Sequence, residues 1–234
     1  KAFKEYFPFL IEAINTKCDR FSDLAKSGET IEMVEETWTL AADMVCRALF
    51  DRKMPFNPHF VFKAVKTYTD VSSHKSIRLG RQSGELKDIT EVDPAKAVET
   101  WWSVPDMVLG EDPLTNREKT LMALLTKAKE DENIPEFDEK QVIDELKQYL
   151  WAGTETTALT LAWTFYIASQ HEEVREKILA EAEEVYGDRD PTFEDVQKLT
   201  YTKNVAQETL RMFPPIWALI RVAKEDDVIE GHEI

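Results

Sequence analysis

The sequence feature that most constrains the fold is a long apolar stretch, residues 138–171, whose centre is the hexapeptide 152–157 (AGTETT). Apolar side chains surround the hexapeptide so closely that a helix built from this stretch is apolar on nearly every face. Such a helix is typical of the interior of a large core. A membrane span is not expected, because Lys147 and Glu155 fall inside the only window long enough to cross a bilayer. We therefore expect a buried central helix.

The start of this helix carries a capping signal. Asp138 is a favourable N-cap residue, and Gln141 stands at the third helical position, from which its side chain can bond back to the N-cap amide. The sequence thus predicts a helix that begins directly after Asp138.

The polar centre of the predicted helix is unusual, because threonines and a glutamate cost free energy in a dry core unless they are hydrogen-bonded. The Thr156 hydroxyl can bond back to the carbonyl of Ala152 and the Thr157 hydroxyl to that of Gly153, and Gly153 leaves bare backbone that a flat ligand can approach. Glu155 and Thr156 would stand beside this notch as a carboxyl and hydroxyl pair able to move protons. The alternative is an ordinary core helix in which Glu155 pairs with a distant arginine.

A second motif lies downstream, at residues 208–215 (ETLRMFPP), where Glu208 and Arg211 are three positions apart and two prolines follow. This spacing alone says little, because Glu172 and Arg175 share it and such pairs are common on helix surfaces. The apolar flanks, the double proline and the position after the hexapeptide distinguish Glu208 and Arg211.

Together the two motifs resemble those of the cytochromes P450, the haem-thiolate monooxygenases. In that family the hexapeptide belongs to the oxygen-binding helix, and residues 208–215 match the ExxR helix with its proline stop. The resemblance covers nearly the whole chain. It implies a mainly α fold, the cytochrome P450-like helical fold in truncated form, with a short β segment at the C-terminal end. Residues 1–234 would then form a partial cytochrome P450 domain.

The resemblance also assigns roles near the hexapeptide. Ala152 and Gly153 would flank the haem cofactor (iron protoporphyrin IX), and Glu155 and Thr156 would be the catalytic pair that delivers protons during dioxygen activation.

Further roles follow for the region around the ExxR helix. Glu208 and Arg211 would form a buried structural ion pair, which is costly to break from one side. Arg221 would bind a haem propionate as a charge-assisted pair. Three residues would line the substrate pocket: Ile216, Trp217 and Ala218.

The axial ligand of the family is a cysteine thiolate in an FxxGxxxCxG loop that follows the ExxR helix. Cys18 and Cys46 both precede that helix and lie on apolar helical stripes, so we expect two buried, unreactive thiols. No metal ligand is predicted in this chain, and the axial cysteine is expected beyond Ile234. The resemblance implies a central fragment that also lacks the family's N-terminal region. Alone, it is not expected to be active.

The expected partners are dioxygen, an apolar small organic substrate, and a ferredoxin or flavin reductase that supplies electrons. Nucleic acid is not expected, because 45 acidic residues against 29 basic ones give a net charge of -16. No targeting or anchor segment is visible in these residues, and the expectation is a cytoplasmic protein, with an N-terminal membrane anchor ahead of Lys1 as the alternative. The alternative is a helical binding or scaffold protein without redox chemistry. That alternative explains the helical periodicity but not the two motifs.

Overall fold

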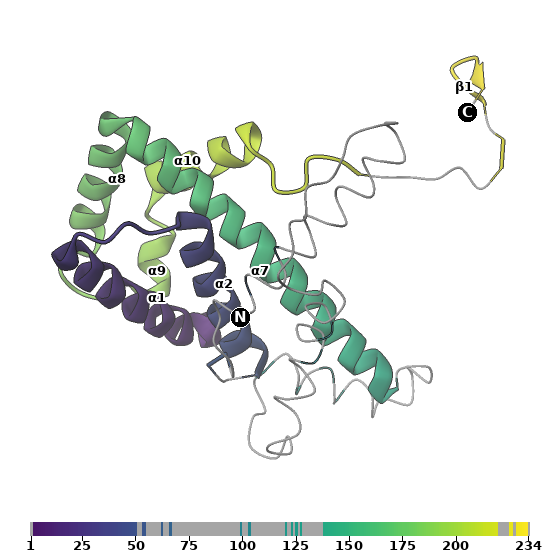
Figure 1. Ribbon diagram of the computed structural model, residues 1–234, viewed down its shortest axis with the longest axis horizontal. Helices are drawn as coiled ribbons and strands as arrows, with labels where there is room; N and C mark the ends of the chain where they lie inside the picture. The colour runs from purple at the N-terminus through teal and green to yellow at the C-terminus, as the bar shows by residue number, and fades with distance from the viewer. Residues whose placement is uncertain are drawn as a thin grey trace.

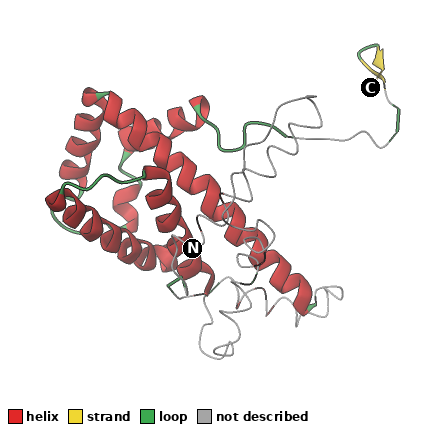
Figure 2. Ribbon diagram, in the orientation of Figure 1, coloured by secondary structure: helices red, strands yellow, loops and turns green. Residues whose placement is uncertain are grey.

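The structure is a computed structural model of the 234-residue chain. It describes residues 2–50, 138–219 and 228–233, together with scattered positions between these ranges. The described residues are mostly helical, with one small hairpin near the C-terminus, as Figure 2 shows. This confirms the predicted mainly α fold with a short β segment. The elements are α1 (Ala2–Ser27), α2 (Met33–Phe50), α7 (Glu139–Gln170), α8 (Glu172–Val185), α9 (Phe193–Val196), α10 (Thr200–Met212), β1 (Val228–Ile229) and β2 (His232–Glu233).

Helix α7 is the long rod on which α2, α8 and α10 pack (Figure 1). It begins at the predicted cap. The Asp138 carboxylate accepts a hydrogen bond from the Gln141 amide at 2.8 Å, and the Gln141 side chain accepts one from the Asp138 amide at 2.7 Å. It ends at Gln170, because His171 adopts an extended conformation that turns the chain directly into α8.

The main core lies between α2 and α7. Helix α7 contributes residues spaced mostly by four, which share one face of a helix, and α2 contributes aromatic, aliphatic and small side chains. Alanines in the contact let the two helices approach closely. The residues that the two helices contribute to this hydrophobic core are Trp38, Ala41, Ala42, Cys46, Leu49, Phe50, Val142, Leu146, Leu150 and Ala158.

The rest of α7 is less covered than its sequence suggests. Tyr149, Phe165 and Tyr166 are 44%, 46% and 55% exposed. The prediction of a helix buried on nearly every face is therefore wrong for the described residues, because α2 covers one stripe and no described element covers all of the rest. Apolar periodicity reveals which side chains favour burial, but not which neighbours are present. None of the described helices combines the length and apolar character that a membrane span requires.

A buried ion network fastens α1 to α2. Glu36 of α2 is 4% exposed, and its carboxylate lies 2.7 Å from both the Arg20 guanidinium and the Lys17 ammonium of α1. Burial raises the pKa of Glu36, but the hydrogen bonds from Arg20 and Lys17 outweigh it and lower the pKa to about 2. The charged form of Glu36 therefore stabilises the contact between the two helices.

The two cysteines have different environments. Cys46 is buried in the core between α2 and α7, and burial raises the pKa of its thiol to about 12, which confirms an unreactive thiol. Cys18 is exposed on α1. The prediction that Cys18 is buried was wrong, because the described part of the chain covers α1 on one side only.

Helix α10 is held in place at its N-terminus by α8. The Glu181 carboxylate of α8 accepts hydrogen bonds from the backbone amides of Tyr201 and Thr202, at 2.6 and 2.8 Å. Carboxylates are favourable at this end of a helix, where amides lack internal partners. The connection between the helices contains Gly187 at φ 56° and the short helix α9. These contacts fix the direction in which α10 approaches α7.

Candidate functional site

The hexapeptide 152–157 forms an unbroken part of α7, and its residues point to different sides. Thr154 is buried and donates its hydroxyl to the carbonyl of Leu150 at 2.7 Å. Ala152 is exposed, and Thr156 donates its hydroxyl to the Ala152 carbonyl at 2.7 Å, as the sequence predicts. The same helical turn thus combines a core threonine with one on an open face.

Gly153 does not form the predicted notch. A Cβ atom placed on Gly153 would lie 3.0 Å from Cγ2 of Val45 in α2, so the side chain of Val45 fills the space that the glycine leaves. The prediction of bare backbone open to a flat ligand is wrong at this position, since a helix and not a cavity faces Gly153. The sequence shows that close approach is possible but not which partner approaches.

Glu155 is half-buried, and none of the residues that the structure describes pairs with its carboxyl group. The alternative in which a distant arginine pairs with Glu155 is therefore not seen among these residues. Burial raises the pKa of Glu155, which favours the protonated carboxyl group. Its catalytic role stays a prediction.

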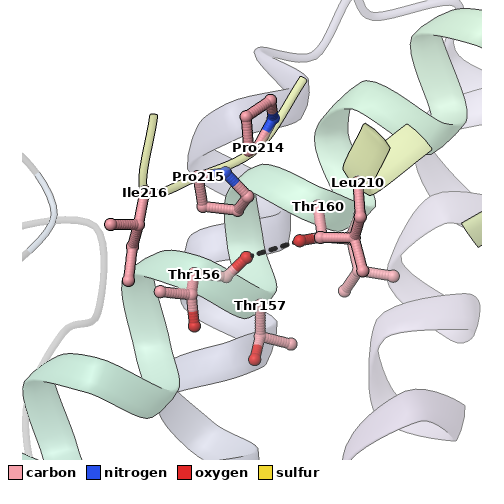
Figure 3. Close-up of a pocket in the computed structure, with 8 residues that line it drawn as sticks. Thr156, Thr157, Thr160, Leu210, Pro214, Pro215 and Ile216 are labelled. Carbon is pink, nitrogen blue, oxygen red and sulfur yellow. Dashed lines mark hydrogen bonds between the residues drawn. The ribbon is translucent and has the colours of Figure 1, made fainter. Parts of the chain in front are cut away.

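A pocket of about 670 Å³ lies between α7 and the chain that follows α10 (Figure 3). Its walls are mainly apolar, with threonine hydroxyls along the α7 side. Thr156 and Ile216, predicted to serve catalysis and substrate binding, both line this pocket. The lining residues are Thr156, Thr157, Thr160, Leu161, Leu210, Pro214, Pro215 and Ile216.

Sequence reasoning missed the hydroxyl row on this side of α7. Thr156, Thr160 and Thr164 each donate to the carbonyl four residues earlier, at 2.7 to 2.8 Å, and we call these three residues the threonine ladder. The Thr164 hydroxyl also lies 3.4 Å from that of Thr209 in α10. The spacing of four between the threonines was the signal that could have found the ladder.

The segment after α10 is placed against α7 by an aromatic contact. Phe213 stacks on Trp163 of α7 with ring centroids 4.0 Å apart and ring planes at 6°. Pro214 follows immediately and cannot continue the helix. Ile216 is thereby brought to the pocket, although it remains 63% exposed. The stack therefore sets the position of one pocket wall.

The other predicted residues beyond α10 are less well determined. Trp217 is 84% exposed, and neither Trp217 nor Ala218 is among the residues that line this pocket, so their substrate role stays a prediction. Arg221 lies outside the described residues.

Glu208 and Arg211 form the predicted ion pair in a bidentate arrangement, with nitrogen to oxygen distances of 2.6 and 2.8 Å. The hydrogen bond from Arg211 lowers the pKa of Glu208. The pair is not buried, however, because 56% of the Glu208 side chain and 70% of the Arg211 side chain are exposed. The prediction of a buried pair is wrong here, since no described element packs over this face of α10.

A model of the cytochrome P450 family matches residues 1–234. The chain belongs to the cytochrome P450 family. Cyclooctat-9-en-7-ol 5-monooxygenase of Streptomyces melanosporofaciens is 38% identical over 114 residues, covering 49% of this chain and 25% of that protein. Pentalenene oxygenase of Streptomyces avermitilis is 33% identical over 117 residues, covering 50% and 26%.

A third relative matches over most of the chain. The chloroplastic protein LUTEIN DEFICIENT 5 of Arabidopsis thaliana is 28% identical over 243 residues, covering 95% of this chain and 40% of that protein. The chain therefore spans between 25% and 40% of the length of these three cytochrome P450 relatives.

The described residues fit one wall of the haem site of a cytochrome P450. Ala152 is exposed, and the partly buried Thr156 lines a mainly apolar pocket, which suits the flat apolar face of a macrocycle. Cys46 is enclosed between helices, Cys18 lies on α1, and no described group of three or more His, Cys, Asp or Glu residues could hold a metal ion.

Proposed function

We propose that this chain forms the dioxygen side of the active site in a haem-thiolate monooxygenase that hydroxylates an apolar organic molecule. One observation carries the proposal. In a chain of the cytochrome P450 family, Thr156 of the oxygen-binding motif and Ile216 after the ExxR helix line the same apolar pocket. Two relatives are named as a monooxygenase and an oxygenase, which supports this class of reaction.

Haem, when bound, supplies the activation of dioxygen. In this proposal Ala152 and Thr156 lie against one face of the cofactor, since both belong to the open side of α7. The Thr156 hydroxyl lines the pocket and donates its proton to the Ala152 carbonyl at 2.7 Å, so it can offer that proton to a guest only after it rotates. Glu155, in which burial raises the pKa of the carboxyl group, is a nearby store of a second proton.

The apolar part of the pocket binds and orients the substrate. Leu161 and Leu210 face it from two helices, and Pro215 and Ile216 close it from the segment after α10. Apolar walls exclude water, which strengthens the polar interactions that remain inside. Electrons would come from a ferredoxin or a flavin reductase.

The first test is the absorption spectrum of the reduced, carbon monoxide-bound protein at its natural length. A strongly red-shifted Soret band is expected for thiolate-ligated haem. A protein without a haem band would contradict the proposal and favour the helical scaffold alternative.

The second test uses two threonines of the same turn. Thr156→Val removes the pocket hydroxyl, and we expect the amount of substrate oxidised per reduced nicotinamide to fall several-fold while haem binding persists. Thr154→Val is the matched control, because its hydroxyl makes the same kind of bond at 2.7 Å but lies in the core. Unchanged coupling in Thr156→Val, or an equal loss in the control, would contradict the role of Thr156.

A further inference from the structure

We propose that Val45 of α2 is a positioning residue: through its contact with Gly153 it fixes the turn of α7 that carries the Thr156 hydroxyl. The proposal rests on the function proposed above. It assigns a role in the pocket geometry to a residue that does not line the pocket.

The contact between Val45 and Gly153 is close. A Cβ atom on Gly153 would lie 3.0 Å from Cγ2 and 3.7 Å from Cγ1 of Val45, and carbon atoms in contact prefer about 3.5 to 4.0 Å. Glycine is unfavourable inside a helix, and Gly153 has no positive φ that would require it. Space for Val45 therefore accounts for the glycine.

Val45 is also stiff. A valine in a helix has one strongly preferred side-chain rotamer, because its Cβ atom is branched. The residues around it on α2, Ala42, Cys46 and Leu49, are all buried in the core. Neither the side chain nor the backbone of Val45 can easily retreat from α7. We therefore expect α7 to take up a substantial part of any adjustment at this contact.

The part of α7 that would adjust also holds Thr156. The peptide unit between Ala152 and Gly153 contains the carbonyl that accepts the Thr156 hydroxyl at 2.7 Å. A shift of Gly153 away from Val45 moves this carbonyl and changes the orientation of the hydroxyl beside the pocket. Val45 thus acts on the pocket through the backbone of one helical turn.

The test follows the methyl resonance of Thr156 in the natural-length protein with labelled threonine methyl groups. Gly153→Ala is expected to shift this resonance and to lower the midpoint of thermal unfolding. Adding Val45→Ala makes room for the new methyl group and is expected to reverse more than half of both changes. This readout needs no haem, so it remains interpretable if the proposed function fails.

Val34→Ala is the matched control, because Val34 is also a partly buried valine of α2 packed against the core. It is expected to lower the midpoint of unfolding without shifting the Thr156 resonance. In haem-loaded protein, the amount of substrate oxidised per reduced nicotinamide should change in the variants that shift the Thr156 resonance. It should not change in Val34→Ala, which is expected to lower only the midpoint of unfolding. The proposal is overturned if Val45→Ala fails to restore the Gly153→Ala variant, or if Val34→Ala shifts Thr156 equally.

Discussion

The two sides of α7 differ in how completely the described structure covers them. On the side that faces α2, which we call the α2 side, Leu146 and Leu150 are at most 1% exposed. On the side that faces the pocket, the α10 side, Leu210 and Ile216 are 43% and 63% exposed. One helix therefore separates a closed core from an open pocket. We therefore expect the α2 side to contribute more to stability, and we propose that the chemistry takes place on the α10 side.

The largest expected effect concerns haem loading, which we expect to need the ion pair between Glu208 and Arg211 of α10. Arg211→Ala in the natural-length protein is expected to abolish most haem-loaded protein, although the exposed pair contributes little to the stability of α10 itself. Arg175→Ala is the matched control, since Arg175 pairs with Glu172 at the same spacing on α8. Haem content per folded protein is the measurement. Equal haem content in the two variants would refute the structural role of the ExxR pair.

On the α2 side, truncation of a buried side chain is expected to cause a large loss of stability. Leu146→Ala is expected to lower the free energy of unfolding by about 2 to 5 kcal/mol, because a fully buried side chain leaves a cavity. Tyr149→Ala, three positions away and 44% exposed, should cost less than half as much although it removes more atoms. Urea denaturation of both variants checks this. Similar losses of unfolding free energy in the two variants would contradict the difference in burial between Leu146 and Tyr149.

The buried ion network between α1 and α2 predicts a pH dependence. Because the pKa of Glu36 falls from its ordinary 4.5 to about 2 on folding, its ionised form contributes about 3 kcal/mol at neutral pH. That contribution is present above pH 4.5 and is lost as the pH falls towards 2. Glu36→Gln should therefore be destabilised at neutral pH, by an amount that shrinks in acid.

The comparison for Glu36 is Asp19→Asn, which alters an exposed carboxylate on α1. This substitution is expected to change the free energy of unfolding little. A difference between Glu36→Gln and the unaltered protein that stays constant from neutral pH to acid would contradict the buried network.

The smallest expected effect concerns Glu155, which has no partner among the described residues. Since burial raises the pKa of Glu155 above the ordinary 4.5, ionisation costs stability as the pH rises past that value. Glu155→Gln should slightly raise the midpoint of thermal unfolding at neutral pH and leave it unchanged below pH 4.5. A fall in the amount of substrate oxidised per reduced nicotinamide in the same variant would support a role for Glu155 in the proposed reaction. A lower midpoint of thermal unfolding for Glu155→Gln at neutral pH would contradict the prediction that ionised Glu155 costs stability.

Local signals in the sequence predicted local structure well. The capping box of Asp138 and Gln141 forms as expected, because its bonds join residues three positions apart. The back-bond from Thr156 to Ala152 forms for the same reason, whereas the one predicted from Thr157 to Gly153 is not seen among the described residues. The family resemblance, which rests on two short motifs, predicted the helical fold and a shared site for Thr156 and Ile216.

Features that depend on distant neighbours could not be predicted. Gly153 could face a ligand or a helix, and only the position of Val45 decides between them. Burial of Cys18 and of the Glu208 and Arg211 pair depends on which elements cover α1 and α10. Residue type and spacing hold no information about such coverage, which is why pairing was predicted correctly for Glu208 and burial was not.

The threonine ladder has a consequence for molecular selectivity. Thr156 and Thr160 both line the pocket, and both already donate their hydroxyl protons to backbone carbonyls. Towards the pocket these two oxygens therefore present lone pairs, which favour guests with N–H or O–H groups. A guest that can only accept must first rotate a hydroxyl, and the carbonyl released by Thr156 keeps its helical amide bond. We therefore expect Thr156 and Thr160 to favour guests that donate hydrogen bonds over guests that can only accept them.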